Sequence, residues 1–445
     1  MNQHYPQINA SEKINIFWFR RDLRIEDNAG LFQALSAPAK VLPVFIFDTV
    51  PAESPDNSED PRVLFILNAL KAIDTKLRQQ GSSVLILIGK PLEIFRKLNG
   101  MLSIHDVYAN EDYEPYAIKR DAEITAFLAT KGITFHLFKD QVIFEKNEVV
   151  KSDGKPYTVF TPYSIAWKKR LLSYPEIIYD SSLLSSNLLR LNPSHAINPL
   201  LNKKGIQNYC ASPDIPYDII KTYDQTRNFP SLEGTSRLSP HLRFGTISIR
   251  KLVRTAAETN NIWLNELIWR EFFMMILWHF PAVVVNSFKS KYDAIHWRNN
   301  EDDFGRWCRG ETGYPMVDAG MRELNATGWM HNRVRMITAG FLVKHLLIDW
   351  RWGEAYFAEK LLDYELSSNN GNWQWAAGCG CDAAPYFRIF NPQEQMRKFD
   401  PDHLYIKKWV PEYGTPRYAS PIVEHDFARK RAIEVYKTAV GARLG

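Results

Sequence analysis

The chain has 445 residues and a formal net charge of +5, which is enough sequence for two or three domains of ordinary size. Hydrophobic residues make up 45% and charged residues 24%, so disorder, collagen and coiled coil are excluded as descriptions of the whole chain. No apolar run reaches the roughly 20 residues of a membrane span. The start from Met1 to Lys13 lacks a secretory signal, and four cysteines are too few for a disulfide scaffold. We therefore expect a cytoplasmic protein.

Short apolar runs alternate with amphipathic stretches in the first 140 residues. The apolar runs, which we predict to be buried strands, are Ile14–Phe19, Val41–Phe47, Ser83–Ile88, Val107–Ala109 and Thr134–Phe138. The predicted helices between them are Ala29–Leu35, Arg62–Gln79, Leu92–Leu98 and Ala117–Lys131. This alternation indicates an α/β domain with a doubly wound parallel sheet. Arg20 and Arg21 follow the first strand without a glycine-rich fingerprint, so the usual dinucleotide motif is absent.

The pattern changes after residue 140. Serine, proline and asparagine cluster in Tyr179–Pro199, which indicates a long inter-domain linker with short helices. From about residue 235 apolar residues recur at helical spacing, which predicts an all-α domain. The helices expected there are Ile249–Ala257, Leu264–Phe280, Met316–Leu324, Val334–Leu347, Tyr356–Leu362 and His425–Val440. The predicted domains are therefore residues 1–138, a linker over 139–205, and residues 206–445.

Tryptophan and charge are unevenly distributed. Of the 13 tryptophans, only Trp18 and Trp167 precede residue 260, and the others lie between Trp263 and Trp409. A packed core does not need so many indoles in one third of the chain, so we infer that this region uses large flat rings. Acidic and basic residues balance in positions 1–200, so the net charge of +5 lies in residues 201–445. That excess is too small by itself to identify a nucleic-acid binder.

Hydroxyl side chains gather just before an apolar helical run in the segment Gly234–Gly245. They are Thr235, Ser236 and Ser239. Hydroxyls and free backbone N–H groups at a helix start can hold phosphate oxygens, and they also serve as ordinary helix caps. Both interpretations stay open at this level.

Two further segments present polar and aromatic side chains on one helical face. The first face carries Glu266, Trp269, Arg270 and Phe273, and the second carries Trp329, Asn332, Arg333 and Met336. Such a face either lines a cavity that stacks a planar ligand, or belongs to a half-exposed helix with an intrahelical Glu–Arg pair. Asparagine offers both donors and acceptors, which suits the edge of a base or a flavin. His331 alone is expected to be structural.

The last segment of interest is Asp363–Pro392. Asn369 and Trp373 are neighbours on one face, and Trp375 lies about 200° further around the helix, so we expect the two indoles to serve different surfaces. Cys379 and Cys381 have no second pair of ligands nearby. We therefore predict no metal site.

Together these segments resemble the DNA photolyase/cryptochrome family of flavoproteins. The similarity runs from FWFRRDLRIEDN (residues 17–28) to RKFDPDHLYIKKWVPE (397–412), and its most specific block is GYPMVDAGMRELNATGWMHNRVRM (313–336). The stretch NNGNWQWAAGCGCDAAPYFRIFNPQ (369–393) is similar to class I cyclobutane pyrimidine dimer photolyases. The resemblance implies an antenna-type α/β domain joined by the linker to an FAD-binding and DNA-binding helical domain.

The resemblance also implies the residues that would bind FAD. Those on the phosphate and adenine side would be Tyr223, Thr235, Ser236, Arg237, Leu238 and Ser239, with Arg270 in the same cradle. Arg335 would pair with Asp363 beside the isoalloxazine ring, and Trp329 would pack near it. Residues Asp363, Tyr364 and Glu365 would contact the flavin and its ribityl chain. Asn369 would face flavin N5, where an amide can stabilise a reduced flavin without adding charge.

UV-damaged DNA is the partner that the resemblance implies. Glu266 and Asn332 would hydrogen-bond a flipped pyrimidine dimer, Trp269 and Trp375 would pack on its rings, and Met336 would form the pocket floor. Arg227, Arg333 and Gln395 match positions that touch DNA. Photolyases are among the enzymes known to flip bases, at a cost of a few kcal/mol. Stacking worth about 1–3 kcal/mol per base offsets that cost.

The chemistry implied by the family is light-driven. Excited reduced FAD passes one electron to the dimer, the cyclobutane ring splits and the electron returns, while Glu266 stabilises the dimer radical anion. A chain of three tryptophans, Trp373, Trp350 and Trp297, matches the relay that photoreduces oxidised flavin. Histidines occupy the positions of Asn332 and Met336 in the (6-4) branches, so we do not expect (6-4) repair.

Other implications are less specific. A second, antenna chromophore of folate or deazaflavin/flavin type is expected; Asp48–Arg62 does not match the folate pattern, whereas Asn110–Tyr116 is compatible with an antenna. The resemblance implies a monomer with no membrane and no obligate protein partner, nucleoid-associated when bound to DNA. Two alternatives stay open: a cryptochrome-like light-signalling flavoprotein without repair activity, and a nucleotide-binding module whose active part is residues 1–140.

Overall fold

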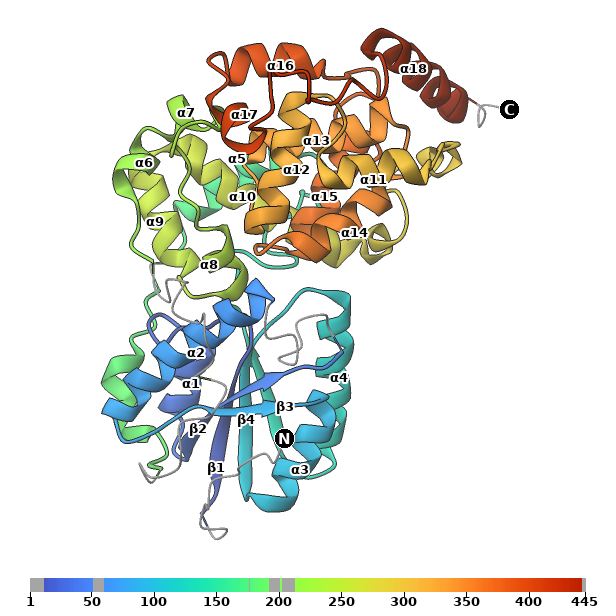
Figure 1. Ribbon diagram of the computed structural model, residues 1–445. Coiled ribbons are helices and arrows are strands. Elements are labelled where there is room, and N and C mark those ends of the chain that lie inside the picture. The colour runs from blue at the N-terminus through green and yellow to red at the C-terminus, as the bar shows by residue number, and fades with distance from the viewer. Residues whose placement is uncertain (1–11, 51–59, 176, 192–200, 202–212, 442–445) are drawn as a thin grey trace. The chain divides into compact units, whose positions relative to one another are not determined.

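The computed structural model describes residues 12–50, 60–175, 177–191, 201 and 213–441 (Figure 1). These residues divide into two compact units. The first draws on the described residues within 1–145, 172–215 and 238–255, and the second on those within 146–171, 216–237 and 256–445. Each unit therefore combines stretches that lie far apart in the sequence. The domain bounds 1–138, 139–205 and 206–445 stay a prediction.

The first unit is built on a five-stranded parallel sheet in the order β3-β2-β1-β4-β5. Its strands are β1 (Ile14–Phe19), β2 (Lys40–Phe47), β3 (Leu85–Ile88), β4 (Ile104–Asn110) and β5 (Thr134–Phe138). The chain builds outward from β1 in one direction and then in the other, which is the doubly wound topology. The predicted α/β fold class is confirmed.

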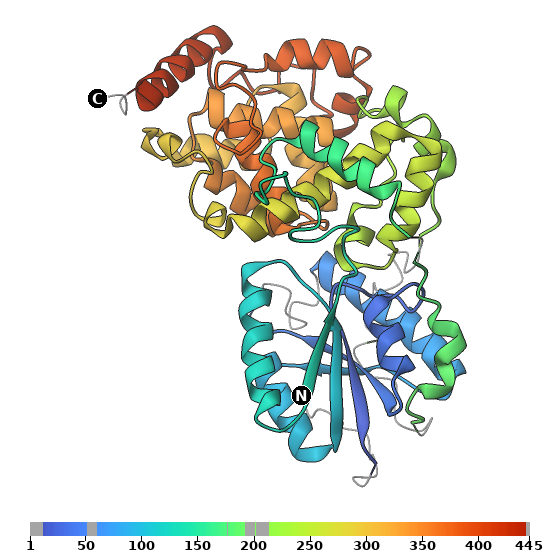
Figure 2. The ribbon, with the colours of Figure 1, turned by 180° about the vertical axis from the view of Figure 1, so that it is seen from behind.

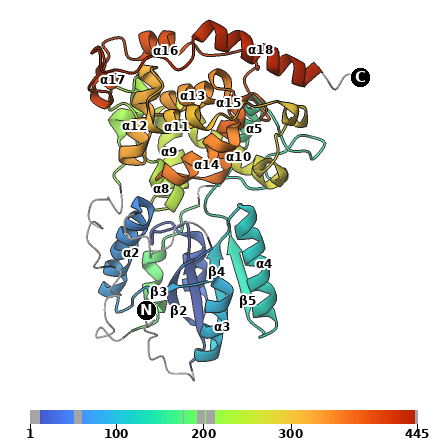
Figure 3. The same cartoon turned by 45° about the vertical axis from the view of Figure 1, so that its right-hand side comes forward.

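Helices cover both faces of this sheet. They are α1 (Ala29–Ser36), α2 (Pro61–Gln79), α3 (Pro91–Met101) and α4 (Pro115–Ala129). The view from behind shows α1 and α4 on opposite sides (Figure 2), and the turned view shows α2 opposite α3 and α4 (Figure 3). Prolines stand in the first turn of α2, α3 and α4, where a missing N–H costs nothing. Trp18 of β1 is buried against Phe95 of α3, with ring centroids 5.3 Å apart.

A buried ion-pair network ties a later segment into the first unit. Arg250 of α9 (Ile249–Thr259) lies 2.9 Å from Asp27 and 2.8 Å from Asp140. Arg24 lies 2.7 Å from the same Asp140, whose side chain is 1% exposed. Burial of an unpaired carboxylate is costly, so each cation here stabilises the compact arrangement of the unit.

The second unit is helical. Its longer helices are α5 (Phe160–Leu171), α10 (Asn261–His279), α11 (Glu301–Arg309), α12 (Pro315–Thr327), α13 (Asn332–Gly340), α14 (Trp350–Lys360), α15 (Leu366–Ala377), α16 (Pro392–Phe399) and α18 (His425–Gly441). Shorter ones are α6 (Tyr217–Lys221), α7 (Tyr223–Thr226) and α17 (Leu404–Trp409). Helix α5 falls within the predicted linker, yet its Trp167 is buried and donates a 2.5 Å hydrogen bond to Glu271 of α10. No helix of the described residues is long and apolar enough to cross a bilayer.

One predicted helix of the second unit is interrupted. The apolar pattern predicted a single helix over Val334–Leu347, but α13 ends at Gly340 and a π-helical turn, Phe341–His345, follows it. Within this turn Lys344 is buried and donates a 3.0 Å hydrogen bond to the carbonyl oxygen of Ala377. Burial lowers the pKa of Lys344 to about 7. The turn thus places a lysine at the end of α15, where a helix terminus attracts a cation.

Candidate functional site

A cavity in the second unit is lined by α13, α14, α15 and the segment that joins α14 to α15. About 610 Å³ of space that no atom fills lies within it, part of it open to solvent. Several of its lining side chains are residues that the sequence predicted for a site: Asn332, Arg335, Met336, Asp363, Tyr364, Glu365, Asn369, Trp373 and Trp375. Phe357, Leu361, Ala339 and Ala376 add apolar surface. The structure thus brings together predicted residues from two helices and a loop.

Helix α15 supplies the largest part of this lining. Asn369 and Trp373, one turn apart, contribute together, as their spacing predicted. The expectation that Trp373 and Trp375 serve different surfaces is wrong, because both line the same cavity. Trp373 reaches it from the core, where it is buried, whereas Trp375 is half-buried. Gly378 ends the helix in the left-handed conformation, with a φ of 85°. Residues that carry a side chain rarely adopt this conformation, so glycine is favoured at this position.

Two ion pairs hold charged groups of this region in place. Arg335 lies 2.8 Å from Asp363, and its Nε donates a 2.8 Å hydrogen bond to the carbonyl oxygen of Met330. Arg270 of α10 lies 3.1 Å from Glu365. The pairing of Arg335 with Asp363 that the resemblance implied is present. Because both carboxylates have fixed partners, they are preorganised to receive hydrogen bonds from a ligand.

Asn369 is held by a residue that the sequence did not single out. Its Nδ2 donates to Glu354 of α14 at two atoms, the carboxylate Oε1 at 2.8 Å and the backbone oxygen at 3.1 Å. An amide nitrogen has two hydrogens, so both are used and the Oδ1 acceptor is the atom left for a ligand. Burial raises the pKa of Glu354, against the opposing effect of this hydrogen bond. No sequence signal relates the two residues.

The predicted face of α10 meets other segments rather than this cavity. Glu266 lies 2.6 Å from Arg227, the C-cap residue that follows α7. Trp269 lies flat against Phe160 of α5, with ring centroids 3.7 Å apart and an interplanar angle of 4°. The backbone N–H of Phe160 donates in turn to Asp382 at 2.9 Å. Glu266 thus pairs with another segment rather than serving the intrahelical pair with Arg270 that the sequence left open.

The start of α13 is fixed by its own cap. His331 precedes the helix, and its Nδ1 accepts a hydrogen bond from the backbone N–H of Arg333 at 3.1 Å. Burial, followed by the charges of nearby arginines, lowers the pKa of His331 to about 4, so the ring is neutral at pH 7. The guanidinium of Arg333 donates to Asn228 at 2.6 Å and lies over the Phe399 ring. The cap leaves Asn332 exposed at the cavity.

The remaining predicted ligand residues lie outside the cavity lining. Tyr223 is buried beneath the Arg227 guanidinium, Arg237 lies 4.4 Å from the ring centre of Trp329, and Gln395 is half-buried on α16. Thr235 and Ser236 are half-buried residues of the second unit, whereas Leu238 and Ser239 belong to the first, at the start of α8 (Ser239–Phe244). The N-cap of α8 is Leu238, so neither hydroxyl of the second unit is that cap. Their roles with FAD stay predictions.

The three tryptophans of the predicted relay share one hydrophobic core. Trp373 and Trp350 are buried members of it, and Trp297 is partly buried and packs against it. Trp373 meets Trp307 edge-on at 6.2 Å, and Trp297 meets Tyr436 edge-on at 6.0 Å. Aromatic rings therefore lie in van der Waals reach of both ends of the predicted path. Whether electrons follow it stays a prediction.

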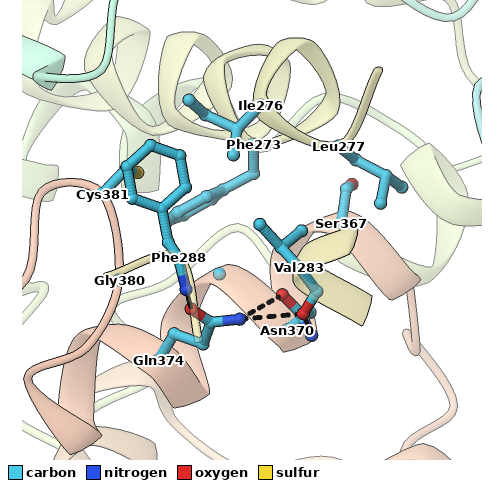
Figure 4. Close-up of a pocket in the computed structure, with 11 residues that line it drawn as sticks. Phe273, Ile276, Leu277, Val283, Phe288, Ser367, Asn370, Gln374, Gly380 and Cys381 are labelled. Carbon is cyan, nitrogen blue, oxygen red and sulfur yellow. Dashed lines mark hydrogen bonds between the residues drawn. The ribbon is translucent and has the colours of Figure 1, made fainter. Parts of the chain in front are cut away.

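A second, smaller cavity borders the opposite face of α15 (Figure 4). About 310 Å³ of space that no atom fills lies within it, part of it open to solvent, and it is lined mostly by apolar side chains such as Phe273 and Ile276. The amide of Gln374 is occupied by hydrogen bonds to the backbone of Phe288 and Val283 and to Asn370. Lacking charged side chains, this cavity is the poorer candidate for a cofactor. In the described part of the chain, no group of three or more His, Cys, Asp or Glu side chains is placed to hold a metal ion.

Comparison with known proteins gives consistent matches. Residues 15–179 match the family model of DNA photolyase, and residues 263–438 match that of the FAD binding domain of DNA photolyase. The chain is 37% identical to deoxyribodipyrimidine photo-lyase of Escherichia coli, over 96% of this chain and 98% of that protein.

Two solved structures are also similar. A bacterial class III photolyase from Agrobacterium tumefaciens matches with a TM-score of 0.81 and 31% identity, over 97% of this chain and 99% of that one. An archaeal photolyase from Sulfolobus tokodaii with two FAD molecules matches with a TM-score of 0.79 and 33% identity, over 95% and 99%.

Proposed function

The chain belongs to the DNA photolyase family, with that family's FAD-binding domain at residues 263–438, and from this premise we propose that it repairs cyclobutane pyrimidine dimers in DNA under light. The observation that carries the proposal is the cavity that gathers Asn332, Met336, Asn369 and Trp375. The relatives act as photo-lyases, whereas the class of lesion is inferred from these residues. The similar structures include a class III photolyase, so the test below compares two lesions.

The residues around the cavity suit a flavin. Arg335 and Asp363 provide a fixed cation and anion beside it, and Asn369 presents an acceptor atom. Phe357 and Leu361 supply apolar surface for a planar ring. Pockets of this kind, mostly apolar with a few oriented polar groups, are typical cofactor sites. When bound, reduced FAD supplies one electron to the dimer under light and takes it back after the ring has split.

The protein's own side chains bind and orient the two reactants. Arg335, Asp363 and Glu365 hold the cofactor, and the Oδ1 of Asn369 accepts a hydrogen bond from it. Asn332 and Glu266 hydrogen-bond the edge of the flipped pyrimidines, while Trp375 packs on their rings and excludes water. Arg227, Arg333 and Gln395 hold the DNA backbone, which fixes the register of the duplex without reading its sequence.

The direct test is repair by the purified protein. The flavin is reduced, a duplex oligonucleotide with one thymine dimer is added, and intact thymines are counted after illumination and in the dark. Light-dependent restoration supports the proposal. A protein that binds FAD, is photoreduced and yet restores no thymines would instead be a light-signalling flavoprotein. A second duplex, with a (6-4) photoproduct, should stay unrepaired.

We also propose a second chromophore, because the Sulfolobus tokodaii relative carries two FAD molecules. An absorption spectrum of the purified protein, together with the FAD content per chain, tests this: a band beyond those of one FAD identifies an antenna. The proposal further includes a monomer that acts in the cytoplasm without an obligate protein partner. Light scattering of the protein alone and with DNA measures its oligomeric state.

A further inference from the structure

The pairing of Glu266 with Arg227 places in contact two residues that the proposed function assigns to different parts of the DNA. Arg227 Nη1 lies 2.6 Å from Glu266 Oε1, and the two side chains are 25% and 30% exposed. Under that function Glu266 contacts the flipped pyrimidines and Arg227 contacts the phosphate backbone. We therefore expect the ion pair to form in the DNA-free protein and to break when DNA binds. This inference rests on the proposed function.

An ionised Glu266 suits the lesion poorly. A carboxylate can only accept hydrogen bonds, whereas a protonated carboxyl can also donate one. The added electron increases the negative charge on the carbonyl oxygens of the pyrimidine, and this charge is stabilised by donors aimed at those oxygens. A second carboxylate charge beside them would be repulsive. The chemistry therefore requires Glu266 in its protonated form when the lesion is bound.

The surroundings of Glu266 favour that form once Arg227 is withdrawn. Burial raises the pKa of Glu266, and the charge and hydrogen bond of Arg227 are what oppose this effect. On α7, the ring of Tyr223 faces the same pair, and its own pKa is raised by burial and by Glu266. Arg270, one turn along α10, is paired with Glu365. At the start of α13, the pKa values of Arg333 and His331 are lowered first by burial, and the charge of Arg227 contributes to both shifts.

The Arg227 side chain is also suited to exchanging its partner Glu266 for a DNA phosphate. Its guanidinium has five N–H donors in a planar fork, which fits a phosphate as well as a carboxylate. Arg227 and Arg333 repel each other, and this repulsion adds to burial in lowering the pKa of Arg333, so a phosphate nearby relieves an unfavourable interaction between the two cations. Glu266 offers Arg227 a single negative charge, whereas the DNA backbone offers several. The backbone can therefore compete with Glu266 for Arg227.

We propose that binding of damaged DNA draws Arg227 from Glu266 to a backbone phosphate, and that Glu266 then takes up one proton from solvent and donates it in a hydrogen bond to a carbonyl oxygen of the flipped pyrimidine dimer. The step is balanced: one proton leaves the buffer, one O–H bond forms on the carboxyl group, and no electron moves. Arg227 thus couples the protonation of Glu266 to the binding of damaged DNA.

The test is proton uptake on binding, measured in the dark by titration calorimetry at pH 7.5 in buffers of different ionisation enthalpy. The full-length protein with bound FAD should take up about one proton per complex with a dimer-containing duplex, because the pKa of one carboxyl rises above the working pH. The same sequence without the dimer should give little uptake. Glu266→Gln should abolish the uptake while the damaged duplex still binds.

A matched control exists in the same unit. Arg322 and Glu412 form an ion pair of almost the same length and exposure, 2.7 Å with side chains 25% and 29% exposed. Glu412→Gln should leave the uptake unchanged. In Arg227→Gln the charge that opposes protonation of Glu266 is gone, so the free protein should already carry more of this proton and the uptake on binding should be smaller. The infrared spectrum of that free variant should show a protonated carboxyl band that the double variant with Glu266→Gln lacks.

Three results would overturn the inference. They are specific binding and repair without proton uptake, uptake that persists in Glu266→Gln, and an Arg227→Gln spectrum without the carboxyl band. Each leaves the proposed repair function intact. A protein that does not prefer the damaged duplex, by contrast, overturns the proposed function and this inference together.

Discussion

Asn369 gives both hydrogens of its side-chain amide to Glu354, one to the carboxylate at 2.8 Å and one to the backbone oxygen at 3.1 Å. The amide therefore cannot rotate without losing two hydrogen bonds. Its Oδ1 is held as an acceptor at the cavity, which favours a cofactor that presents an N–H group there. At flavin N5, the atom that Asn369 is expected to face, a hydrogen is present only when the ring is reduced.

Glu354→Ala is expected to release this amide. Loss of one oriented hydrogen bond, worth about 1 kcal/mol, should lower the midpoint potential of the bound FAD by about 20 mV for a two-electron couple. Spectroelectrochemical titration measures the shift. Glu359→Ala changes an exposed glutamate on the same helix and should leave the potential unchanged. An equal potential in both variants would mean that Glu354 does not position Asn369.

Glu266→Ala should weaken repair and leave FAD in place. Removing its hydrogen bond to the lesion, worth about 1.5 kcal/mol, should lower the affinity for the dimer-containing duplex about tenfold, and the repair yield per photon should fall as well. Fluorescence anisotropy and photon-counted repair assays measure the two effects. Glu412→Ala, at the matched ion pair, provides the control. Loss of FAD in the Glu266 variant would indicate a structural role instead.

Trp373→Phe should separate two light-driven processes. Photoreduction of oxidised FAD should slow by roughly tenfold or more, since the first ring of the predicted path is replaced by one that is harder to oxidise. Repair by protein that has been reduced chemically should continue. Trp307→Phe is the matched control, because Trp307 is also buried and meets Trp373 edge-on but lies outside the predicted path. Loss of both processes would show that Trp373 supports the fold or the cavity.

Gly353→Ala should disturb the same indole without removing it. A Cβ on Gly353 of α14 would collide with the ring of Trp373 and with Leu342, both of which are buried in the core. Overpacking of this kind costs about 1–3 kcal/mol, so the free energy of unfolding should fall by that amount. Urea denaturation measures it. Gly441→Ala meets no neighbour and is the control, and a Gly353 variant as stable as wild type would contradict the packing described.

His331→Asn should change the response to acid. The pKa of His331 falls from its usual 6.5 to about 4 in the folded protein, mainly through burial, so below pH 6.5 the unfolded chain binds a proton that the folded chain refuses. Stability is therefore lost as pH falls from 6.5 toward 4, by up to about 3 kcal/mol. Asparagine keeps a cap for α13 but does not titrate, so the variant should lose less stability over this window. Urea denaturation at pH 7 and pH 4.5 makes the comparison, with the exposed His296→Asn as control. Parallel losses in all three proteins would contradict the assignment.

Much of the fold could be predicted because it depends on local patterns. The strand at Ile14–Phe19 is buried as predicted. Thr134–Phe138 is a strand as predicted, but the prediction that it is buried is wrong, because it lies at the edge of the sheet and none of its residues is buried. Strand β4 begins three residues earlier than predicted, at Ile104, because His105 and Asp106 interrupt its apolar run and pairing with neighbours keeps them extended. The π-helical turn at Phe341–His345 has the same apolar spacing as a helix, so periodicity alone could not detect it.

The site was predicted less completely, for a physical reason. Helical spacing identifies residues that share a face, such as Asn369 and Trp373, but it does not identify what meets that face. Glu354, which orients Asn369, and Phe160, which covers Trp269, come from other elements and are fixed only by tertiary packing. The ion pair of Arg227 with Glu266 belongs to this class. The two residues were predicted separately, as a DNA contact and a lesion contact, and their pairing emerged only in three dimensions.

The ion pairs of Arg250 with Asp27 and Asp140 have a consequence for recombination between relatives of this chain. Arg250 comes from the middle of the sequence, yet it stabilises the sheet-bearing unit near the N-terminus. A chimaera joined anywhere between residues 145 and 238 takes the acids from one parent and the arginine from the other. It stays stable only when both parents supply matching charges. A junction placed after Thr255 takes Leu238–Thr255 and the N-terminal segments from the same parent, and so keeps the ion-pair network intact. Hybrids with such junctions should fold.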